Sequence, residues 1–590
     1  MEWTIKKLQA PSSKLQAEEI IKILLHNRGL KTKKEIDTFL NPLPPFNLTL
    51  KELGIAKREL AKAVKRIRKA IEDKEEMIVW GDYDADGVCG TAILWETIYA
   101  LGGRVMPYIP DRVTEGYGLN KVAVKKLVTR NPQLTTLITV DHGITAHKKI
   151  DYAQKLGLDI IVTDHHQLGK TLPKAQAVVH SPKISGAAVA WVLARELAKQ
   201  SEDISPNTSE VCERTPARWV FGNGNNLDLV SIGTIADLMP LIGPNRSFVK
   251  FGLKELNQTK RVGLLALLKE AGLRIGEIDP YQVGWMIAPR LNASGRLKDA
   301  MDSLRLLCTK DRQRAGDLAL KLSKINKERQ ELLEKTFLQA EARVLKQELS
   351  LKNLLFLSDE SYHEGIIGLV AGRLVQKFYR PAVVVSEGKT YSKASARSIN
   401  GFDIIKAIRE CEPDLVDCGG HPLAAGFTIE TKKLKAVKKK ILEIAKKALD
   451  KKSLTKSLKI DCEVRLADLN FELYQAISQL APFGMGNPEP LFASRGLRVL
   501  NAKLVGKNQG HLKLLLDDPK TSKIERAGAE AELVSQLPFD GIGFGLGEIY
   551  HKLTKDRLID IAYSLSLNEW NGKKRLELKI RDIKITQVSG

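Results

Sequence analysis

The chain has 590 residues, more than a single hydrophobic core can organise, so roughly three or four domains are expected. Hydrophobic residues make up 43% of the sequence and charged residues 28%, as in ordinary soluble proteins, and no apolar run approaches the ~20 residues of a membrane-spanning helix. No membrane segment is therefore expected. The formal net charge of +23 favours a polyanionic partner such as nucleic acid, ahead of a merely lysine-rich composition.

Cysteine usage indicates the compartment. The six cysteines are scattered without a CxxC pair, which argues against a disulfide framework and against a zinc knuckle. The N-terminal residues MEWTIKKLQAPSSK contain no apolar stretch of the kind found in secretory signals. We therefore expect a reducing, cytoplasmic location.

In chain order, the first regions are an N-terminal extension and an α/β domain. Residues 1–60 combine a short helix, IIKILLHNRG, with the loop NPLPPFN, and we expect them to pack on the next region of the chain. Residues 61–310 alternate short β-branched strands with helices, the pattern of a parallel sheet. Within them, residues 201–226 are polar and rich in Pro and Asn, and we interpret them as a surface insertion.

A long helix and two further domains come next. Residues 311–350 contain no proline and no glycine after Gly316, with apolar residues at helical spacing, so they predict a helix that joins two domains. Residues 351–455 form a smaller α/β pattern that ends in a lysine-rich helix. One face of that helix carries Leu434, Val437, Ile441 and Ile444. This face favours a solvated amphipathic helix over a phosphate-binding one. Residues 456–590 alternate short strands with turns, as in an oligonucleotide-binding (OB) barrel.

Three short strand-like runs in the first α/β region, MIVW, LITV and IIVT, lead directly into acidic residues or histidines. Those residues are Asp82, Asp84 and Asp86 after the first run, Asp141 and His142 after the second, and Asp164, His165 and His166 after the third. The carboxyl ends of parallel strands share one crevice, so we expect these side chains to converge. Because uncompensated buried carboxylates are costly, their convergence predicts a metal site.

Two other interpretations of the segment DYDADG are weaker. An EF-hand loop would have a bidentate Glu at its twelfth position, where this chain has Ile93, and it would follow a helix instead of a strand. A haloacid dehalogenase-like phosphatase would use Asp84 as its nucleophile and would need an acidic pair after a later strand. That later strand carries Asp164 followed by two histidines instead.

The number and type of the side chains favour two metal ions. Imidazole suits manganese and other transition metals, and the set exceeds what one ion can use once Asp237 of SIGTIADLMPLIG is added. Two divalent ions ~3.5–4 Å apart would use them, with Asp141 as the shared carboxylate. Such a pair activates a water to attack phosphorus and stabilises the leaving oxygen.

Structural roles stay open for some of these residues. Asp164 could cap a following helix or support a neighbouring ligand from behind. His142 could simply shape a turn, since Asp141 and Gly143 already explain the local geometry. Asp237 could cap a helix end.

Several motifs together resemble those of one family. GDYDADGVCGTA, TVDHGI, TDHHQ and IADLMPL are similar, in order, to the metal motifs of the DHH phosphoesterases. IAPRLNASGRL, YHEGIIGLVAGRL, SARSINGFD and GGHPLAAGF resemble motifs of the RecJ family within that group. The resemblance covers nearly the whole chain. It implies a DHH catalytic domain at 61–310, a connecting helix at 311–350, a DHH-associated substrate-binding domain at 351–455 and an OB-fold nucleic-acid-binding domain at 456–590.

The resemblance also implies roles for individual residues. The metal ligands would be Asp82, Asp84, Asp86, Asp141, His165 and Asp237. His166 would sit beside the scissile phosphate, and it and Asp141 would be the catalytic residues. Substrate contacts would come from Arg290, Asn292, Arg296, His363, Arg373, Ser395, Arg397 and His421. Arg296 and Arg373 could instead form ion pairs on helix surfaces.

The expected function is a single-stranded-DNA-specific exonuclease of DNA repair and recombination. It would degrade DNA from 5′ to 3′ by hydrolysis with two divalent ions, Mn²⁺ or Mg²⁺. The polarity and the DNA preference rest on the resemblance alone, as do two expected partners, a single-strand-binding protein and a helicase. One alternative is a DHH phosphodiesterase acting on oligoribonucleotides or cyclic dinucleotides, against which the predicted barrel argues. Another is a catalytically inactive scaffold, against which the complete acid set argues.

Overall fold

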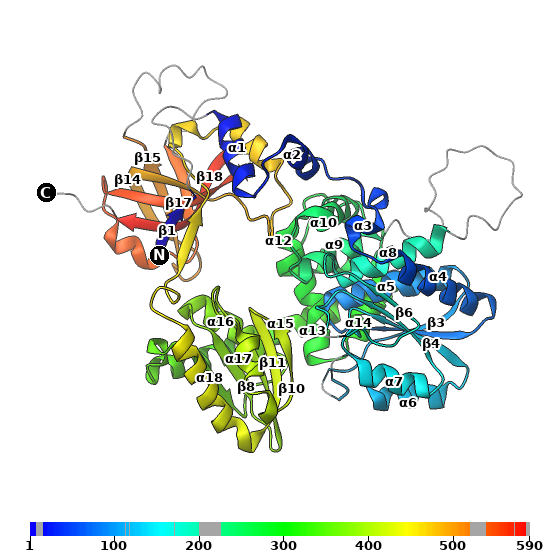
Figure 1. Cartoon of the computed structure of the whole chain (residues 1–590). Helices are drawn as coiled ribbons and strands as arrows, with labels where there is room; N and C mark the ends of the chain where they lie inside the picture. The colour runs from blue at the N-terminus through cyan, green and yellow to red at the C-terminus, as the bar shows by residue number, and fades with distance from the viewer. Residues whose placement is uncertain are drawn as a thin grey trace, which may run out of the picture. The chain divides into compact units, whose positions relative to one another are not determined.

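The structure is a computed structural model that describes residues 1–6, 16–112, 114–116, 118–169, 171–199, 226–519, 538–570 and 573–585. The surface insertion predicted at 201–226 lies outside the described residues, apart from Asn226. The chain divides into two compact units (Figure 1). One unit is formed by residues 43–455, and the other combines residues 1–42 with residues 456–590. In the described part of the chain, no helix is both long and apolar enough to cross a membrane.

A parallel sheet with the strand order β3-β2-β4-β5-β6 organises the first half of the larger unit. Its strands are β2 (Glu76–Gly81), β3 (Arg104–Tyr108), β4 (Leu134–Val140), β5 (Asp159–Asp164) and β6 (Ala177–His180). The strand order reverses at β2, because the chain passes from β2 to β3 on one side and then crosses to β4 on the other. Ligands of open α/β sheets bind at such a reversal, beside the carboxyl ends of the strands.

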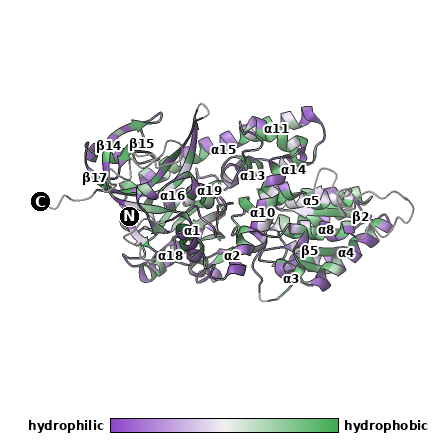
Figure 2. Ribbon diagram, turned by 90° about the horizontal axis from the view of Figure 1, so that it is seen from above, coloured by the Kyte–Doolittle hydropathy of each residue, from purple (hydrophilic) through white to green (hydrophobic). Residues whose placement is uncertain are grey.

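Helices cover both faces of this sheet (Figure 1). On one face lie α4 (Lys57–Glu72), α5 (Ala85–Ala100) and α8 (Gly186–Lys199), and on the other lie α6 (Lys121–Arg130) and α7 (His147–Lys155). Successive strand residues point to opposite faces, so Val79 and Ile138 contact the first set and Ile78 and Leu137 the second. Burial on both faces explains why the strands are apolar throughout. Figure 2 shows this hydrophobic interior in α5, α8 and the strands beside them.

Further helices complete this half of the unit. They are α3 (Leu50–Leu53), α9 (Leu227–Ala236), α10 (Gly243–Leu256), α11 (Val262–Glu270), α12 (Pro280–Gln282), the π-helix η3 (Val283–Ile287), α13 (Ala288–Leu297) and α14 (Met301–Cys308). The predicted connecting helix is confirmed, since α15 runs for 35 residues from Arg312 to Lys346.

A second sheet, with the order β10-β11-β9-β8-β7, comes after α15. Its strands are β7 (Leu355–Asp359), β8 (Ala382–Ser386), β9 (Tyr391–Arg397), β10 (Leu415–His421) and β11 (Ala424–Glu430), and its helices are α16 (Ile367–Phe378), α17 (Ile404–Arg409) and α18 (Leu434–Ala448). The second half of α15 and α16 pack on one face, and α17 and α18 pack on the other. In α18, Leu434, Val437 and Ile441 are buried while most lysines are exposed, which confirms the predicted amphipathic helix.

The smaller unit contains a closed barrel. Its elements are β12 (Ser457–Ile460), β13 (Cys462–Glu463), α19 (Phe471–Ser478), β14 (Phe492–Val505), β15 (His511–Asp517), β16 (Phe539–Gly543), β17 (Leu558–Trp570) and β18 (Lys573–Ile585). β14 pairs with both β15 and β17, which closes the ring β14-β15-β16-β18-β17. Leu512, Leu514 and Leu516 alternate inward along β15. The predicted fold class, a parallel-sheet domain, a smaller α/β domain, a long connecting helix and a barrel, is confirmed.

The prediction that residues 1–60 pack on the next region is wrong for residues 1–42, which belong to the barrel unit. β1 (Glu2–Ile5) pairs in parallel with β12, and α1 (Ala17–Asn27) and α2 (Lys33–Leu40) contribute to the core of the barrel. From residue 43 onward the segment packs on the parallel-sheet domain. Local sequence pattern cannot reveal a pairing between segments so far apart in the chain.

Candidate metal centre

The acidic residues leave the sheet at its strand-order reversal. Asp82 follows β2 directly and Asp141 follows β4, the two strands between which the order reverses. The Asp82 amide donates to the Val140 carbonyl at 3.2 Å, and the Asp141 amide donates to the Thr163 carbonyl at 3.0 Å. Asp141 has a φ of +66°, a left-handed conformation that Asp and Asn adopt more readily than other residues with side chains. This backbone conformation directs the carboxylate of Asp141, the residue predicted to be shared by two ions, into the crevice.

The potential ligand atoms form three groups, and within each group all atoms lie within 4.8 Å of one another. They are Asp82, Asp84 and Asp141; Asp86, His165 and Asp237; and Asp141, His165 and His166. Asp141 belongs to two of these groups, as expected of a carboxylate shared between two ions. The structure therefore brings together all six residues that were predicted as ligands.

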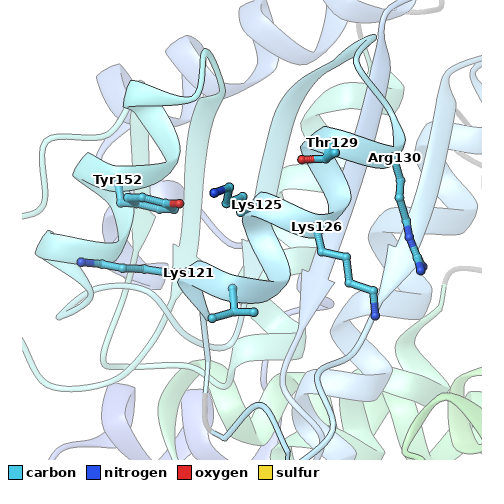
Figure 3. Close-up of a pocket in the computed structure, with 7 residues that line it drawn as sticks. Lys121, Lys125, Lys126, Thr129, Arg130 and Tyr152 are labelled. Atoms are coloured by element: carbon cyan, nitrogen blue, oxygen red, sulfur yellow. The ribbon is translucent and has the colours of Figure 1, made fainter.

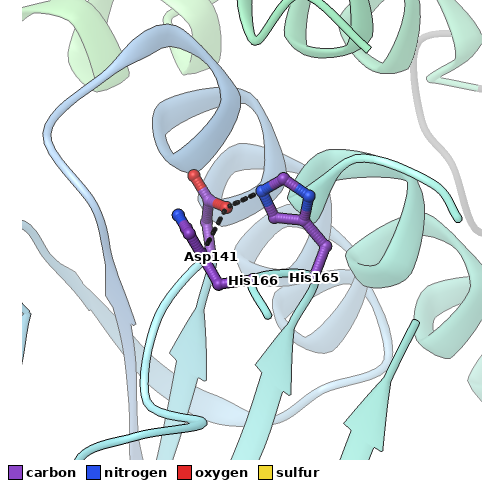
Figure 4. Close-up of side chains that lie close together, drawn as sticks. All are labelled: Asp141, His165 and His166. Carbon is purple, nitrogen blue, oxygen red and sulfur yellow. Dashed lines mark ion pairs between the residues drawn. The ribbon is translucent and has the colours of Figure 1, made fainter. Parts of the chain in front are cut away.

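His165 lies close to three carboxylates, and Figure 4 shows it beside one of them, Asp141. Its Nε2 atom is 3.1 Å from Asp141 Oδ1, 3.5 Å from Asp237 Oδ2 and 4.0 Å from Asp86 Oδ2. Burial, followed by the charge of His166, lowers the pKa of His165 to about 3. The imidazole is therefore neutral, which is the form that binds metals.

The carboxyl groups repel one another in the absence of a cation. Burial, followed by the charges of neighbouring carboxylates, raises the pKa of Asp86 to about 7 and that of Asp237 to about 8, and it raises the pKa values of Asp82 and Asp141 well above the usual range. The Oδ1 atom of Asp82 is also buried without a hydrogen bond among the described residues. Divalent cations would compensate these charges, and a donor set of carboxylates with one imidazole fits Mn²⁺ or Mg²⁺.

Two of the carboxylates also hold helix N-termini in place. Asp84 Oδ1 accepts hydrogen bonds from the amides of Asp86 and Gly87 in the first turn of α5, at 3.0 and 3.1 Å. Asp86 accepts from the amides of Gly186 and Ala187 at the start of α8, at 2.6 and 3.0 Å. These bonds fix the direction of both side chains, since the helix N-terminus favours a negative charge.

Two glycines that sequence analysis did not select pack directly against the carboxylates. A Cβ atom on Gly186 would lie 2.4 Å from Asp141 Oδ1, and a Cβ on Gly233 would lie 2.3 Å from Asp86 Oδ1. With any larger residue, either the carboxylate or the helix that carries the glycine would have to move. Nothing in the segments SGAAVA and SIGTIAD marks these positions, because the contacts are made by distant parts of the chain.

Asp164 supports His166. Its carboxylate accepts from the amides of Ile144, His165 and His166, and from His166 Nδ1 at 2.8 Å. Burial opposes both charges, but the hydrogen bond between the two side chains lowers the pKa of Asp164 and raises that of His166 to about 9. The described residues between β5 and β6 contain no helix, so Asp164 does not cap one there.

Structural roles had also been left open for His142 and Asp237. His142 is buried and donates from Nε2 to the Trp80 carbonyl at 3.0 Å, and burial lowers its pKa to about 4, so it ties β4 to β2 as a structural residue. Asp237 follows the C-terminus of α9. Asp237 is the C-cap residue, and its backbone N–H donates to the Gly233 and Ile235 carbonyls, but a carboxylate there is unfavourable with respect to the helix dipole, so capping does not explain the side chain.

Residues of α13 contact the segment that carries the acids. Asn292 Oδ1 accepts from the Ala85 amide at 2.7 Å, so this predicted substrate residue holds the acidic loop. Arg296 donates to the Gly365 carbonyl at 3.3 Å, which links the two α/β domains of the unit. Burial, followed by the charges of Arg112 and Arg329, lowers the pKa of Arg296 to about 10.

Arg112 completes a cluster of arginines that sequence analysis missed. Its guanidinium lies 5.0 Å from the ring centroid of Tyr83, in the acidic loop. Burial and the charge of Arg112 also lower the pKa of Arg397. The position of Arg112 shortly after a strand end, in YIPDR, was the available signal, but only the sheet order places β3 beside β2. Clustered guanidinium groups have the chemistry that suits an anion.

Of the five predicted substrate residues of the second α/β domain, Arg373 contacts α15. The other four, Ser395, Arg397, His363 and His421, contact a helix N-terminus, a loop or a histidine of the metal centre. A Cβ on Gly368 would lie 2.9 Å from Ser395 Oγ and 3.5 Å from an Arg397 terminal nitrogen, so both side chains reach the first turn of α16, a favourable place for an anion. The His421 ring is stacked 6.4 Å from that of His166, and His363 Nδ1 accepts from the Gly365 amide at 3.0 Å.

The described contacts of Arg373 and Arg290 are with residues other than the acids of the metal centre. Arg373 pairs with Glu334 and lies 5.2 Å from the Phe337 ring centroid, which matches the surface ion pair that the sequence left open. Arg290 donates to the Met286 carbonyl and to Ser323 Oγ.

Comparison with known proteins agrees with this architecture. Family models match for the DHH family N-terminal domain at residues 76–213, the DHHA1 domain at 351–447 and the RecJ OB domain at 460–582. The single-stranded-DNA-specific exonuclease RecJ of Bacillus subtilis (strain 168) is 33% identical, over 100% of this chain and 71% of that protein. The chain belongs to the RecJ family.

Other RecJ proteins are similar along most of their length. RecJ of Dickeya dadantii (strain 3937) is 29% identical over 96% of this chain and 96% of that protein. The crystal structure of RecJ from Thermus thermophilus in complex with Mn²⁺ has a TM-score of 0.78 and 28% identity, covering 100% of this chain and 80% of that chain. The corresponding complex with Mg²⁺ has a TM-score of 0.72 and 26% identity, covering 100% and 79%. The resemblance to the RecJ family is thus confirmed.

Proposed function

We propose that the protein is a metal-dependent hydrolase that degrades single-stranded DNA from its 5′ end in DNA repair and recombination. The observation that carries the proposal is the buried group of carboxylates around a neutral His165, with arginines beside it. Metal-binding acids next to guanidinium groups suit the cleavage of a phosphodiester. Membership of the RecJ family supports the choice of single-stranded DNA.

Asp82, Asp84, Asp86, Asp141, His165 and Asp237 would hold two divalent ions, Mn²⁺ or Mg²⁺. Such ions supply an activated water and stabilise the leaving oxygen. Asp141 would be shared between them. The Thermus thermophilus RecJ structures, one in complex with Mn²⁺ and one in complex with Mg²⁺, support this choice of metals.

The remaining residues bind and orient the phosphate. His166, held by Asp164, presents a positively charged imidazole beside Asp141, at 4.0 Å, where it stabilises charge on the scissile phosphate. Arg112, Arg296 and Arg397 supply bidentate donors for phosphate oxygens. Ser395 and the N-terminus of α16 add neutral donors to the same region.

A polymer is the better substrate than a dinucleotide. The chain continues into an OB domain, a fold that holds single strands by basic grooves and stacking. The alternative, a phosphodiesterase for oligoribonucleotides or cyclic dinucleotides, has no use for that domain. A single-strand-binding protein, a helicase and a cytoplasmic location remain expectations from the family resemblance.

An end-labelling experiment tests this function. Single-stranded DNA labelled at either end is incubated with the protein and Mn²⁺, beside duplex DNA, a dinucleotide and a sample with a chelator. We expect early release of the 5′ label as mononucleotide from single strands, and no release with the chelator. Faster hydrolysis of the dinucleotide than of long DNA would favour the phosphodiesterase, and binding without turnover would favour the scaffold.

Replacing Asp164 with Asn tests the role assigned to His166. Asn keeps the shape and can still accept from the His165 and His166 amides through its one oxygen, but it loses the acceptor of the Ile144 amide and removes the charge that holds the imidazolium. We expect kcat to fall by roughly 10- to 100-fold, the range typical of residues that orient metal-site groups, with little change in KM. A His166→Ala variant should lose a similar factor, and the double variant should lose little more than His166→Ala. Additive losses in the double variant would show that Asp164 acts independently of His166.

A further inference from the structure

Helices α6 and α7 border an open groove of about 580 Å³ (Figure 3). The groove lies on the face of the sheet away from α5 and α8. Its lining residues are Lys121, Val122, Lys125, Lys126, Thr129 and Arg130 of α6 and Tyr152 of α7. Four of these seven residues are cations and none is acidic. We call Lys121, Lys125, Lys126 and Arg130 the basic face of α6.

The charge of the basic face is not neutralised locally. The ten residues of α6 include no acid, and the structure describes no ion pair for any of the four cations. In α4, which is also rich in cations, three of the seven, Lys62, Arg66 and Lys69, form ion pairs with carboxylates. In α6, cations without an acid on the same helix lie beside the Tyr152 ring, and this combination suits a polyanionic ligand.

The basic face begins beside the metal centre. A Cβ on Gly118 would lie 3.5 Å from His142 Nδ1, and His142 follows Asp141. Lys121 comes three residues after Gly118, and its ammonium group lies 5.4 Å from the ring centroid of Tyr152. From Lys121 to Arg130 the helix extends for ~14 Å at about 1.5 Å per residue. A strand that passes the metal centre can therefore continue along α6.

The composition of the face favours nucleic acid over protein. Lysine is depleted in protein–protein interfaces, whereas single-strand binding sites combine rows of Lys and Arg with aromatic rings. In Figure 3, Lys125 lies toward Tyr152, while Lys126 and Arg130 extend from the other side of α6. The face thus offers cations on both sides of the helix and one aromatic ring.

We propose that the basic face of α6 is a second nucleic-acid binding surface, which contacts backbone phosphates of the DNA strand outside the metal centre. The inference rests on the proposed function, because it assumes that the substrate is a long strand. It gives the larger unit a strand-binding surface in addition to the OB domain.

The test compares two pairs of adjacent exposed lysines. Lys125→Gln/Lys126→Gln removes two charges from α6, and Lys446→Gln/Lys447→Gln removes two from the end of the amphipathic helix α18. The affinity of the Mn²⁺-loaded protein for a labelled oligodeoxythymidine with hydrolysis-resistant phosphorothioate linkages is measured over a series of salt concentrations. We expect the slope of log affinity against log salt to become shallower by up to about 1.4 for the α6 pair, at about 0.7 per phosphate contact, and to stay unchanged for the α18 pair.

Hydrolysis of a dinucleotide, which is too short to reach α6, should stay unchanged in both variants. An unchanged salt slope in the α6 pair, or an equal change in both pairs, would overturn the inference. Loss of binding to poly-aspartate by the α6 pair, with DNA binding intact, would also overturn it and would assign the face to a protein partner. Failure of the unsubstituted protein to hydrolyse either substrate would instead contradict the proposed function.

Discussion

Replacing Asp141 with Asn is expected to lower the rate of phosphodiester hydrolysis by roughly 10³-fold, since losing ~4 kcal/mol of charge stabilisation corresponds to that factor. Asp141 belongs to two of the three groups of ligand atoms, so its loss weakens both proposed metal positions at once. Asn is preferred to Ala because it accepts the left-handed backbone, with φ +66° at this position, at little cost.

The same substitution should stabilise the metal-free protein. Burial and the neighbouring carboxylates make the charge on Asp141 unfavourable, which is the reason for its raised pKa. Removing that charge relieves the repulsion, whereas ligand binding stabilises only a protein that retains the site. We therefore expect a higher melting temperature in the presence of a chelator and a smaller increase on addition of Mn²⁺ than in the unsubstituted protein.

Asp556→Asn is a matched control for both measurements. Asp556 also has a positive φ, +64°, but it is exposed and lies in the barrel unit. Its substitution should leave activity unchanged and stability within about 0.5 kcal/mol. If Asp141→Asn retained most of the activity, or if chelator-treated Asp141→Asn melted below the unsubstituted protein, the assignment of Asp141 as a shared ligand would be wrong.

Replacing Gly233 with Ala should lower kcat/KM by roughly 100-fold or more, a factor that a displacement of about 1 Å can produce. The added methyl group would lie 2.3 Å from Asp86 Oδ1 and 2.8 Å from the Ala187 side chain, so α9 or the carboxylate must move. Because Asp86 also binds the first amides of α8, it has little freedom to yield. We expect a weaker Mn²⁺ dependence of activity together with an intact fold, measured by Mn²⁺ titration and circular dichroism.

Gly316→Ala provides the comparison, because Gly316 also lies inside a helix, α15, but has no atom within 4 Å of an added Cβ. That variant should keep full activity and gain ~0.4–1 kcal/mol of stability from the smaller freedom of its unfolded chain. Full activity in Gly233→Ala would mean that the packing of α9 on Asp86 does not control the site.

Much of the fold was accessible from local pattern. Strands buried on both faces have continuous apolar sequences, and α15 shows a long helical period without proline, so both were predictable from neighbouring residues alone. The N-terminal segment was misplaced for the opposite reason. Its pairing of Glu2 with Ser457 joins two sequences 455 residues apart, and neither carries a signal for the other.

The candidate site divides in the same way. Acidic residues directly after strands predict their own convergence, because parallel strands end at one edge of a sheet, and this reasoning selected Asp82, Asp141 and His165. The same reasoning did not select Arg112, because its nearness to Arg296 and Arg397 depends on the order of the strands and on the packing of two domains. Arg290 and Arg373 were selected by resemblance, yet in the structure they bond to neighbouring side chains and carbonyls.

By itself, the sequence determined the chemistry of the protein: strands that end in carboxylates and imidazoles, a basic chain, and a barrel after two α/β domains. Those features are local or compositional, so no tertiary information was needed. Only the tertiary structure decided which residues surround the acids: the glycines packed on Asp86 and Asp141, the bond from Asp164 to His166, and the cluster around Arg112. The reason is physical, because contacts within 4 Å between distant segments depend on strand order and packing, which no local periodicity encodes.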